Sequence, residues 1–288
     1  MQEVKEKPLF LTVYTLLALL FLSANSLLCK LAFLNEGIDP FSFSAIRIFS
    51  AALSLFILLQ FKTDSKPLEK GNWLAGFMLF LYAITFSYSY VLIDTGIGAL
   101  ILFGVVQIIM ITFAVLKKEQ INFFKILGAI IAFIGLIYLL LPTKHEQVSL
   151  KGALLMAIAG IAWAIYSIIG KKTQHPLSVT YSNFLMAFVF IFILSFFVSV
   201  TGNIQMSSFI YALISGAVTS GIGYVLWYVV VTKIETSTAS IIQLTVPILA
   251  TLGGVVFLKE TLTVQTIIAT VVILSGILLS TISKKNAA

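Results

Sequence analysis

Long runs of apolar residues, interrupted at short intervals by polar or helix-breaking residues, dominate the chain. A helix needs about 20 apolar residues to cross the ~30 Å hydrocarbon core of a bilayer. By this criterion the sequence predicts ten membrane-spanning helices joined by short loops, and hence an all-α integral membrane protein. The predicted spans lie near residues 9–29, 40–61, 73–93, 96–116, 123–141, 151–170, 177–200, 206–232, 236–258 and 263–283.

Most prolines support these boundaries. Pro40, Pro142 and Pro176 fall at the ends of predicted spans, where a missing N–H donor is tolerated. Pro247 instead lies inside the ninth span, and a proline at that depth frees a backbone carbonyl that neighbouring helices must satisfy. Pro247 is therefore either a packing kink or a hinge beside a functional site.

The composition agrees with a lipid environment. Of the 288 residues 60% are hydrophobic and only 10% are charged, whereas about 25% of the residues of a soluble domain are charged. So few charges cannot coat a water-facing surface, which excludes a soluble enzyme and a nucleic-acid-binding module. One cysteine and two histidines exclude a disulfide framework and make a metal site unexpected. Nucleotide-binding and nucleophile motifs are absent, so we expect no cofactor and no enzymatic activity.

The net charge of +7 follows from topology. If the N-terminus is cytoplasmic, 13 lysines face the cytoplasm and 4 face outward, namely Lys30, Lys144, Lys151 and Lys259. The positive-inside rule then predicts that both termini are cytoplasmic. The basic excess therefore requires no nucleic-acid partner, and the expected contact is with lipid headgroups.

The two halves of the chain match when positions 141 residues apart are compared. We expect one repeat in residues 1–142 and another in 143–288, each with five spans. Because five is odd, tandem repeats must sit in the membrane with opposite orientations, an arrangement typical of secondary transporters. A duplication that serves only stability is the alternative. The matched pairs are Lys30 and Lys171, Asp94-Thr95 and Glu235-Thr236, Lys118-Glu119 and Lys259-Glu260, and, at a spacing of 136, Pro40 and Pro176, and Arg47 and Asn183.

Charged residues are almost absent from the spans. All 11 carboxylates lie in loops or at helix ends, which argues against a buried proton relay. Arg47 is the only charged residue clearly inside a span. It either contacts an anionic group such as a substrate carboxylate, or it is a structural arginine bonded to helix-end carbonyls or headgroups. Both interpretations stay open at the level of sequence.

Aromatic and amide side chains recur at helical spacing on several spans. Trp163 and Tyr166 share one face of the sixth span, and Tyr224 and Trp227 share one face of the eighth. Aromatic rings with polar tips, together with a few amides, are suited to line a cavity for an amphipathic solute. Near helix ends the alternative is an interfacial belt. The candidate cavity residues are Asn25, Arg47, Tyr82, Phe86, Tyr90, Gln107, Trp163, Tyr166, Tyr181, Asn183, Tyr224, Trp227 and Gln243.

The fifth and tenth spans instead contain small residues at close spacing, including Gly128, Ala132, Gly135, Ala269 and Gly276. Small residues allow helix backbones to approach closely in a membrane. These two spans are therefore expected to form scaffold or a subunit contact.

Several stretches carry a family resemblance. Residues 22–25 followed by Lys30 form a first-helix pattern, and Trp163 keeps in the second half the tryptophan that Leu22 replaces in the first. Arg47 stands in the second span, Lys-Glu pairs follow the fourth span of each half, and residues 243–248 carry the ninth-span proline. Residues 98–107 complete the set. Over essentially the whole chain, these features resemble the EamA family of the drug/metabolite transporter superfamily.

The resemblance implies a ten-helix carrier of the bacterial inner membrane that moves a small organic solute by alternating access. Amino acids, metabolites and drug-like compounds are all candidate solutes, and such carriers are commonly exporters. Its partners would be the solute and the bilayer, with a monomer or a homodimer both allowed. The alternative function is a membrane-embedded enzyme or lipid-modifying protein. That class predicts clustered His, Asp or Glu near one interface, which the positions of the carboxylates do not show.

Overall fold

The computed structural model describes residues 8–34, 37–61, 69–119, 123–141, 148–198 and 204–282. All regular secondary structure in these ranges is helical. The elements are α1 (Pro8–Ala32), α2 (Pro40–Gln60), α3 (Trp73–Tyr90), α4 (Thr95–Leu116), α5 (Phe123–Leu140), α6 (Leu150–Gly170), α7 (Pro176–Ser195), α8 (Met206–Ile214), the π-helical segment η2 (Ser215–Ile222), α9 (Gly223–Val231), α10 (Thr236–Ile242), α11 (Thr245–Leu258) and α12 (Val264–Ile282).

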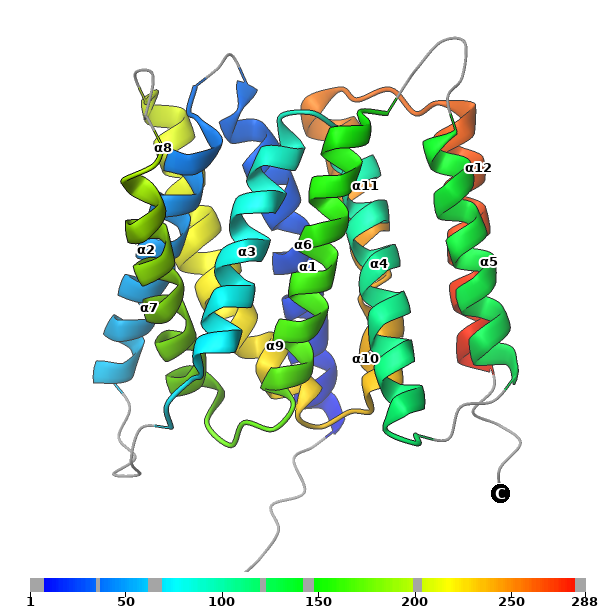
Figure 1. Cartoon of the computed structure of the whole chain (residues 1–288), viewed down its shortest axis with the longest axis horizontal. Coiled ribbons are helices and arrows are strands. Elements are labelled where there is room, and N and C mark those ends of the chain that lie inside the picture. The colour runs from blue at the N-terminus through cyan, green and yellow to red at the C-terminus, as the bar shows by residue number, and fades with distance from the viewer. Residues whose placement is uncertain are drawn as a thin grey trace, which may run out of the picture.

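The helices stand side by side and alternate in direction, so that the start of α1 and the end of α12 lie at the same, lower end in Figure 1. Eight helical stretches are long and apolar enough to cross a membrane. One of them joins α8, η2 and α9, and another joins α10 and α11. Shorter apolar stretches lie in α5 and α12. The prediction of an all-helical membrane protein is thus confirmed for the described part of the chain.

Capping side chains at the ends of several helices agree with the predicted loops. The Asp39 carboxylate accepts a hydrogen bond from the Ser42 N–H at 2.9 Å at the start of α2. The Asn72 side chain accepts one from the Ala75 N–H at 2.7 Å at the start of α3. Such caps satisfy N–H groups that have no partner inside the helix. Many large apolar side chains on the outer surface are exposed, as lipid contact requires.

The first helix of each half packs among helices of the other half. Helix α1 contacts α8, η2, α9 and α11, and α6 contacts α3 and α4. Helix α2 also packs against η2 and α7. Interior side chains from both halves therefore meet at the centre.

Helices α5 and α12 pack along each other at one edge of the bundle (Figure 1). A Cβ atom added to Gly276 would lie 2.5 Å from the Gly128 carbonyl oxygen and 2.7 Å from the Ala132 nitrogen. A Cβ atom added to Gly135 would lie 2.7 Å from a side-chain carbon of Ile273. The small residues of these two helices are therefore used for tight packing within the chain.

Substitution of Gly276 by alanine is expected to destabilise the protein. The new methyl group would meet backbone atoms, which cannot move aside as a flexible side chain can, and such overpacking costs roughly 1–3 kcal/mol. Gly253→Ala in α11 is a matched control, because its Cβ would lie 3.5 Å from the nearest atom, an ordinary contact. Thermal unfolding in one detergent should show a lower midpoint for Gly276→Ala alone; equal midpoints for the two variants would contradict the expected close packing.

Candidate functional site

Arg47 of α2 lies in the interior, between α3, η2 and α9, and is only 1% exposed. Its Nε donates a hydrogen bond to the Ser220 hydroxyl at 2.8 Å. Its Nη2 donates to the hydroxyls of Tyr224 at 2.6 Å and Tyr82 at 3.3 Å. Its Nη1 has no hydrogen-bond partner. Neither of the two ion pairs in the described ranges involves Arg47, so a buried positive charge is left with hydroxyl partners and one unused donor face.

Aromatic rings surround this guanidinium. Its carbon atom lies 5.0 Å from the centre of the Phe86 ring and 5.2 Å from that of Tyr82. The Trp163 ring contacts those of Tyr82 and Tyr224, at centroid distances of 5.1 and 4.7 Å. The rings come from α3, α6 and α9, and thus from both halves of the chain. Ring faces stabilise a cation without neutralising its charge.

Asn25 of α1 connects this cluster to the π-helical segment. Its side-chain oxygen accepts hydrogen bonds from Ser215 at 2.9 Å, Thr219 at 2.6 Å and Ser220 at 3.2 Å. Its side-chain nitrogen has no partner. The wider turn of a π-helix is often found at functional sites, and here it directs three hydroxyls toward one amide. We call Asn25, Arg47, Tyr82, Ser220 and Tyr224 the central polar cluster.

Gln243 lies at a break in the helix and holds Trp163 in place. The Trp163 Nε1 donates to the Gln243 side-chain oxygen at 2.7 Å. Helix α10 ends at Ile242 and α11 begins at Thr245. Pro247 lacks the N–H that would reach the Gln243 carbonyl, and the Val246 N–H bonds to that carbonyl instead at 3.0 Å. The predicted ninth span is thus interrupted between α10 and α11, just before its proline.

The remaining predicted residues occupy different surroundings. Tyr166 and Tyr228 stack at 4.8 Å, and Trp227 donates to the Ser167 hydroxyl at 2.9 Å. The Phe86 and Tyr90 rings meet edge to face at 4.6 Å. Gln107 is buried, and neither atom of its amide has a partner. Tyr181 is half-buried and pairs with the Phe56 ring at 6.1 Å, away from the central polar cluster.

A hollow of about 440 Å³ lies at the lower end of the bundle, where α3 and α7 begin and α4 and α6 end. Asn183, the repeat mate of Arg47, is fully buried and lines this hollow. Both polar atoms of its amide lack a hydrogen-bond partner. We call this feature the lower hollow. Its lining residues are Glu69, Lys70, Gly71, Asn72, Ala75, Phe113, Lys117, Ile168, Ile169, Lys172, Thr173, Val179 and Asn183.

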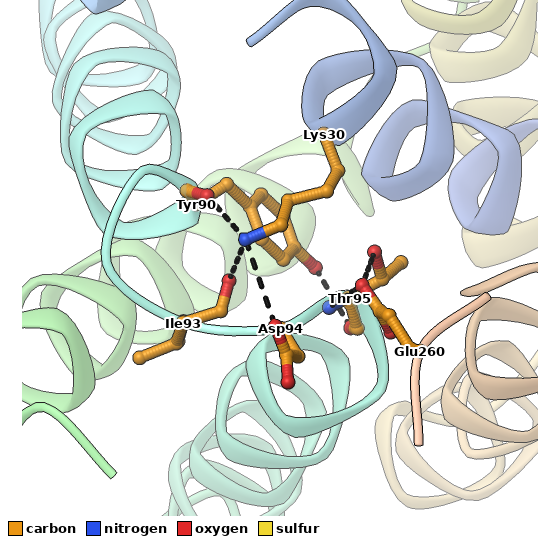
Figure 2. Close-up of polar contacts among 6 residues, drawn as sticks. All are labelled: Lys30, Tyr90, Ile93, Asp94, Thr95 and Glu260. Atoms are coloured by element: carbon orange, nitrogen blue, oxygen red, sulfur yellow. Dashed lines mark hydrogen bonds and ion pairs between the residues drawn. The ribbon is translucent and has the colours of Figure 1, made fainter. Parts of the chain in front are cut away.

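At the upper end, Glu260 caps a helix of the other half. Figure 2 shows the Glu260 carboxylate directed at the start of α4, where one of its oxygens accepts bonds from the Thr95 N–H at 2.8 Å and the Thr95 hydroxyl at 2.6 Å. Asp94, at the N-cap position itself, makes no capping bond. Lys30 donates to the carbonyl oxygens of Ile93 at 2.8 Å and Tyr90 at 3.1 Å (Figure 2). We call Lys30, Asp94, Thr95 and Glu260 the upper-end cluster.

The equivalent residues of the other half meet at the lower end. Lys171 donates to the Thr236 hydroxyl at 2.9 Å and lies 3.7 Å from the Glu119 carboxylate. That carboxylate accepts a longer bond from the Ser237 N–H at 3.4 Å, at the start of α10. Partial burial alone raises the pKa of Glu119, but the Thr236 hydrogen bond and the Lys171 charge outweigh it and lower the pKa. Glu119 is thus ionised at neutral pH. We call Glu119, Lys171, Thr236 and Ser237 the lower-end cluster.

Both glutamates follow a lysine in left-handed conformation. Lys118 has φ 56° and Lys259 has φ 55°, the two positive values among the non-glycine residues described. A left-handed residue after the last helical turn reverses the chain and satisfies the terminal carbonyls. The turn carries Glu119 back toward α10 and Glu260 back toward α4, so each half of the chain caps a helix of the other.

Several residues of these sites were not among those predicted. Ser215 and Thr219 were missed because serine and threonine at helical spacing are common in membrane helices, where their hydroxyls bond to the backbone. The run of small and hydroxyl residues from 215 to 221 was the available signal. The two end clusters could be found only by pairing the matched positions across the repeats.

The arrangement can bind an anionic group, and it offers no cluster for metal chemistry. Among the described residues no three His, Cys, Asp or Glu side chains gather as metal ligands. The central polar cluster offers a guanidinium, three hydroxyls and an amide in a closed interior. Such groups suit recognition by charge-assisted hydrogen bonds.

Comparison with known proteins gives a consistent picture. A model of the EamA-like transporter family matches residues 9–141 and again 150–282. Uncharacterized protein PA1977 of Pseudomonas aeruginosa is 39% identical over 267 residues, or 92% of either chain. An uncharacterized transporter of Archaeoglobus fulgidus is 26% identical over 83% of this chain and 88% of its own. The threonine/homoserine exporter RhtA of Salmonella typhimurium is 28% identical over 54% of this chain and 53% of its own.

The fold itself also has a solved counterpart. One crystal structure, described only as that of a protein, superimposes with a TM-score of 0.74. The match covers 98% of this chain and 100% of the other, at 17% sequence identity. At that identity the likeness concerns the fold alone.

Proposed function

Because the chain belongs to the EamA-like transporter family, we propose that it exports a small carboxylate-bearing solute, such as an amino acid, across the bacterial inner membrane by alternating access. It is a multi-pass membrane protein of a transporter family. A carboxylate-bearing substrate is inferred from Arg47, a buried cation with an unused donor face and no carboxylate partner among the described residues. A substrate carboxylate would supply the missing negative charge.

The proposal favours the functional interpretation of Arg47 over the structural one. A structural arginine would use its donors on helix-end carbonyls or headgroups, whereas the partners of Arg47 are three side-chain hydroxyls and two aromatic rings. A buried charge without a paired counter-ion is expensive to maintain. It is retained in membrane helices chiefly where it serves a pathway or a ligand. The distant similarity to a threonine/homoserine exporter agrees with an amino-acid substrate.

The proposed mechanism uses ten helices in two inverted repeats, residues 1–142 and 143–288, with both termini in the cytoplasm. The alternating directions of the helices and the shared lower end of α1 and α12 support it. In this orientation the lower end of Figure 1 is cytoplasmic. Both end clusters are formed in this structure, but the Glu260 contacts at the upper end are short, whereas at the lower end the Glu119 contacts are longer and the hollow is present. If the upper end opened while the lower end closed, and then the reverse, the central polar cluster would be exposed first to one side of the membrane and then to the other.

Pro247 is proposed as the hinge of this motion. The break between α10 and α11 leaves the Gln243 side chain bonded to Trp163 beside the central polar cluster. A change at the break would therefore move the indole ring directly. Pro247→Ala restores an N–H donor for the Gln243 carbonyl, and unchanged exchange rates in that variant would argue against a hinge.

Counterflow in proteoliposomes tests the proposed function. The purified protein is reconstituted, loaded with an unlabelled candidate solute, and assayed for uptake of labelled amino acids, neutral aromatic drugs and amines. We expect exchange of at least one carboxylate-bearing solute. If only amines or neutral compounds exchange, the carboxylate proposal is wrong. If nothing exchanges, while a fluorescent anionic lipid is modified or moved between leaflets, the alternative of a lipid-modifying protein is favoured.

Within that assay, Trp163→Ala is expected to reduce exchange at least about tenfold. The substitution removes the ring beside Tyr82 and Tyr224 and the bond to Gln243. An aromatic pair and a hydrogen bond each contribute about 0.5–1.5 kcal/mol. Trp73→Ala is the matched control, because Trp73 is 58% exposed and packs on Phe190 at the periphery. Equal effects of the two variants would show that Trp163 has no special place in transport.

A further inference from the structure

The rim of the lower hollow carries an excess of positive charge. Lys70, Lys117 and Lys172 all line it and are exposed. The two ion pairs in the described ranges involve other lysines. Lys117 is oriented by the Phe113 ring, whose centre lies 5.7 Å from its ammonium nitrogen. Three ammonium groups thus share one opening without a carboxylate within ion-pair distance in the described structure.

The only acidic residue of the lining, Glu69, already accepts hydrogen bonds from neighbouring groups of the chain. One oxygen of Glu69 accepts hydrogen bonds from the Thr173 hydroxyl at 2.9 Å, the Gln174 N–H at 2.9 Å and the His175 N–H at 2.7 Å. Glu69 therefore fastens the chain at the start of α7, a position that favours a negative charge. Three positive charges against this one leave the lining with a net charge of +2.

The deep end of the hollow contains polar groups that lack partners. Both amide atoms of Asn183 are unpaired although the side chain is fully buried. The buried Tyr166 hydroxyl lies close enough to the Asn183 and Thr180 side chains to interact with both, but neither it nor the Thr180 hydroxyl forms a hydrogen bond of good geometry. Buried polar groups normally have a hydrogen-bond partner. The walls between rim and amide are apolar and include Phe113, Ile168 and Ile169.

We propose that the lower hollow is a binding site for an anionic amphiphile, with a phosphate or carboxylate at the lysine rim and a polar contact to the Asn183 amide. From the opening inward, the hollow presents positive charge at the rim, apolar walls and one unpaired amide. This order suits a ligand with an anionic head and a largely apolar body. The site is separate from the central polar cluster: none of the cluster's five residues lines it. Its placement on the cytoplasmic side rests on the proposed orientation, but binding itself does not require transport.

Two sources supply this chemistry. An acidic lipid of the cytoplasmic leaflet can place its headgroup in a basic pocket between membrane helices. A dissolved organic anion can bind there before it enters the interior. Both would place the same charged group at the same lysines, and the experiment separates them by the medium in which the anion is offered.

Binding is measured on the full-length protein in nanodiscs. One set contains phosphatidylcholine alone, titrated with sodium octanoate as the dissolved anionic amphiphile. The other contains increasing fractions of phosphatidylglycerol without octanoate. The readout is the thermal unfolding midpoint, which rises when a ligand binds the folded state. Three proteins are compared: the wild type, Lys117→Gln/Lys172→Gln, and the control Lys151→Gln/Lys233→Gln, which removes equal charge from residues outside the hollow.

We expect stabilisation of the wild type and the control by at least one anion source. For Lys117→Gln/Lys172→Gln we expect about a 30-fold weaker response, from about 1 kcal/mol for each lysine near an anionic surface. Asn183→Ala should weaken the response to phosphatidylglycerol less than the lysine double variant does and leave its salt dependence unchanged. It should leave the response to octanoate unaltered, because octanoate has no polar group beyond its carboxylate. A response to phosphatidylglycerol alone identifies a lipid site, and a response to octanoate identifies a solute site. Equal loss in both double variants, or no response in the wild type, would overturn the proposal whether or not the protein transports a solute.

Discussion

Replacement of Arg47 by glutamine is expected to lower exchange of carboxylate-bearing solutes about thirtyfold or more while the protein still folds. Removal of one member of a buried, hydrogen-bonded charge pair costs about 2–5 kcal/mol of binding, and each 1.4 kcal/mol is tenfold. Without substrate the Arg47 charge has no counter-ion among the described residues. Its loss therefore relieves a desolvation penalty that offsets the lost contacts to Ser220 and Tyr224.

Two measurements separate this outcome from a structural role for Arg47. The unfolding midpoint of Arg47→Gln should stay within a few degrees of the wild type, and any bound neutral solute should be retained. Arg47→Lys should be intermediate, because lysine keeps the charge but lacks the planar fork that reaches Ser220, Tyr82 and Tyr224 together. A protein that fails to fold in both variants, or one that exchanges carboxylates normally, would contradict the proposed site.

Removal of the two repeat-related glutamates is expected to shift the conformational equilibrium in opposite directions. Glu260→Ala deletes the acceptor of two bonds from Thr95 at the upper end. Glu119→Ala deletes the partner of Lys171 and Ser237 at the lower end. A hydrogen bond to a charged group contributes about 1.5–3 kcal/mol. Each variant should therefore change the ratio of upper-open to lower-open protein roughly tenfold or more.

The shift can be followed by labelling with a membrane-impermeant maleimide in a Cys29→Ala background, since Cys29 is the single cysteine. Ala75→Cys reports on the lower hollow, and Ile93→Cys reports on the upper-end cluster. Both native side chains are buried, so labelling at either position requires that end to open. Glu260→Ala should speed labelling at position 93 relative to 75, and Glu119→Ala should do the reverse. Thr95→Val, which removes one of the two bonds to Glu260, should act like Glu260→Ala but more weakly. A shift in the same direction for both glutamates would rule out end clusters that work in opposition.

The fold was predictable because a bilayer allows few backbone structures to span it. Apolar runs of helix length can only be helices in a bilayer, since every backbone polar group must be satisfied internally. The helical spans from α1 to α7 therefore begin and end within a few residues of the predictions. The π-helical segment was not predicted, because it depends on a side chain of another helix. The break before α11 lies beside Pro247, where the sequence had indicated a kink or a hinge. Asn25 collects the η2 hydroxyls, and Trp163 occupies Gln243 at the break.

The candidate site was predictable only in part. Helical spacing selected Tyr82, Trp163 and Tyr224, whose rings lie together in the interior, because a polar or aromatic stripe on a lipid-embedded helix turns inward. Spacing along one helix carries no information about which other helix it meets. The sequence therefore grouped Tyr181 with this set, whereas it lies against Phe56. It also missed Thr180, whose unpaired hydroxyl becomes notable only beside Asn183 and the hollow.

The crossed packing of α1 and α6 has a consequence for how the protein is made. A ribosome that has released only the first five helices leaves α1 without α8, η2, α9 and α11, the elements that it contacts in the finished structure. Asn25 and Arg47 would then lie in the bilayer without several of their hydrogen-bond partners, because Ser215, Ser220 and Tyr224 have yet to be synthesised. Neither Asn25 nor Arg47 has its full set of partners before the second half arrives. The central polar cluster can therefore be completed only after the second half has entered the membrane, so its assembly is a late step that joins the two halves.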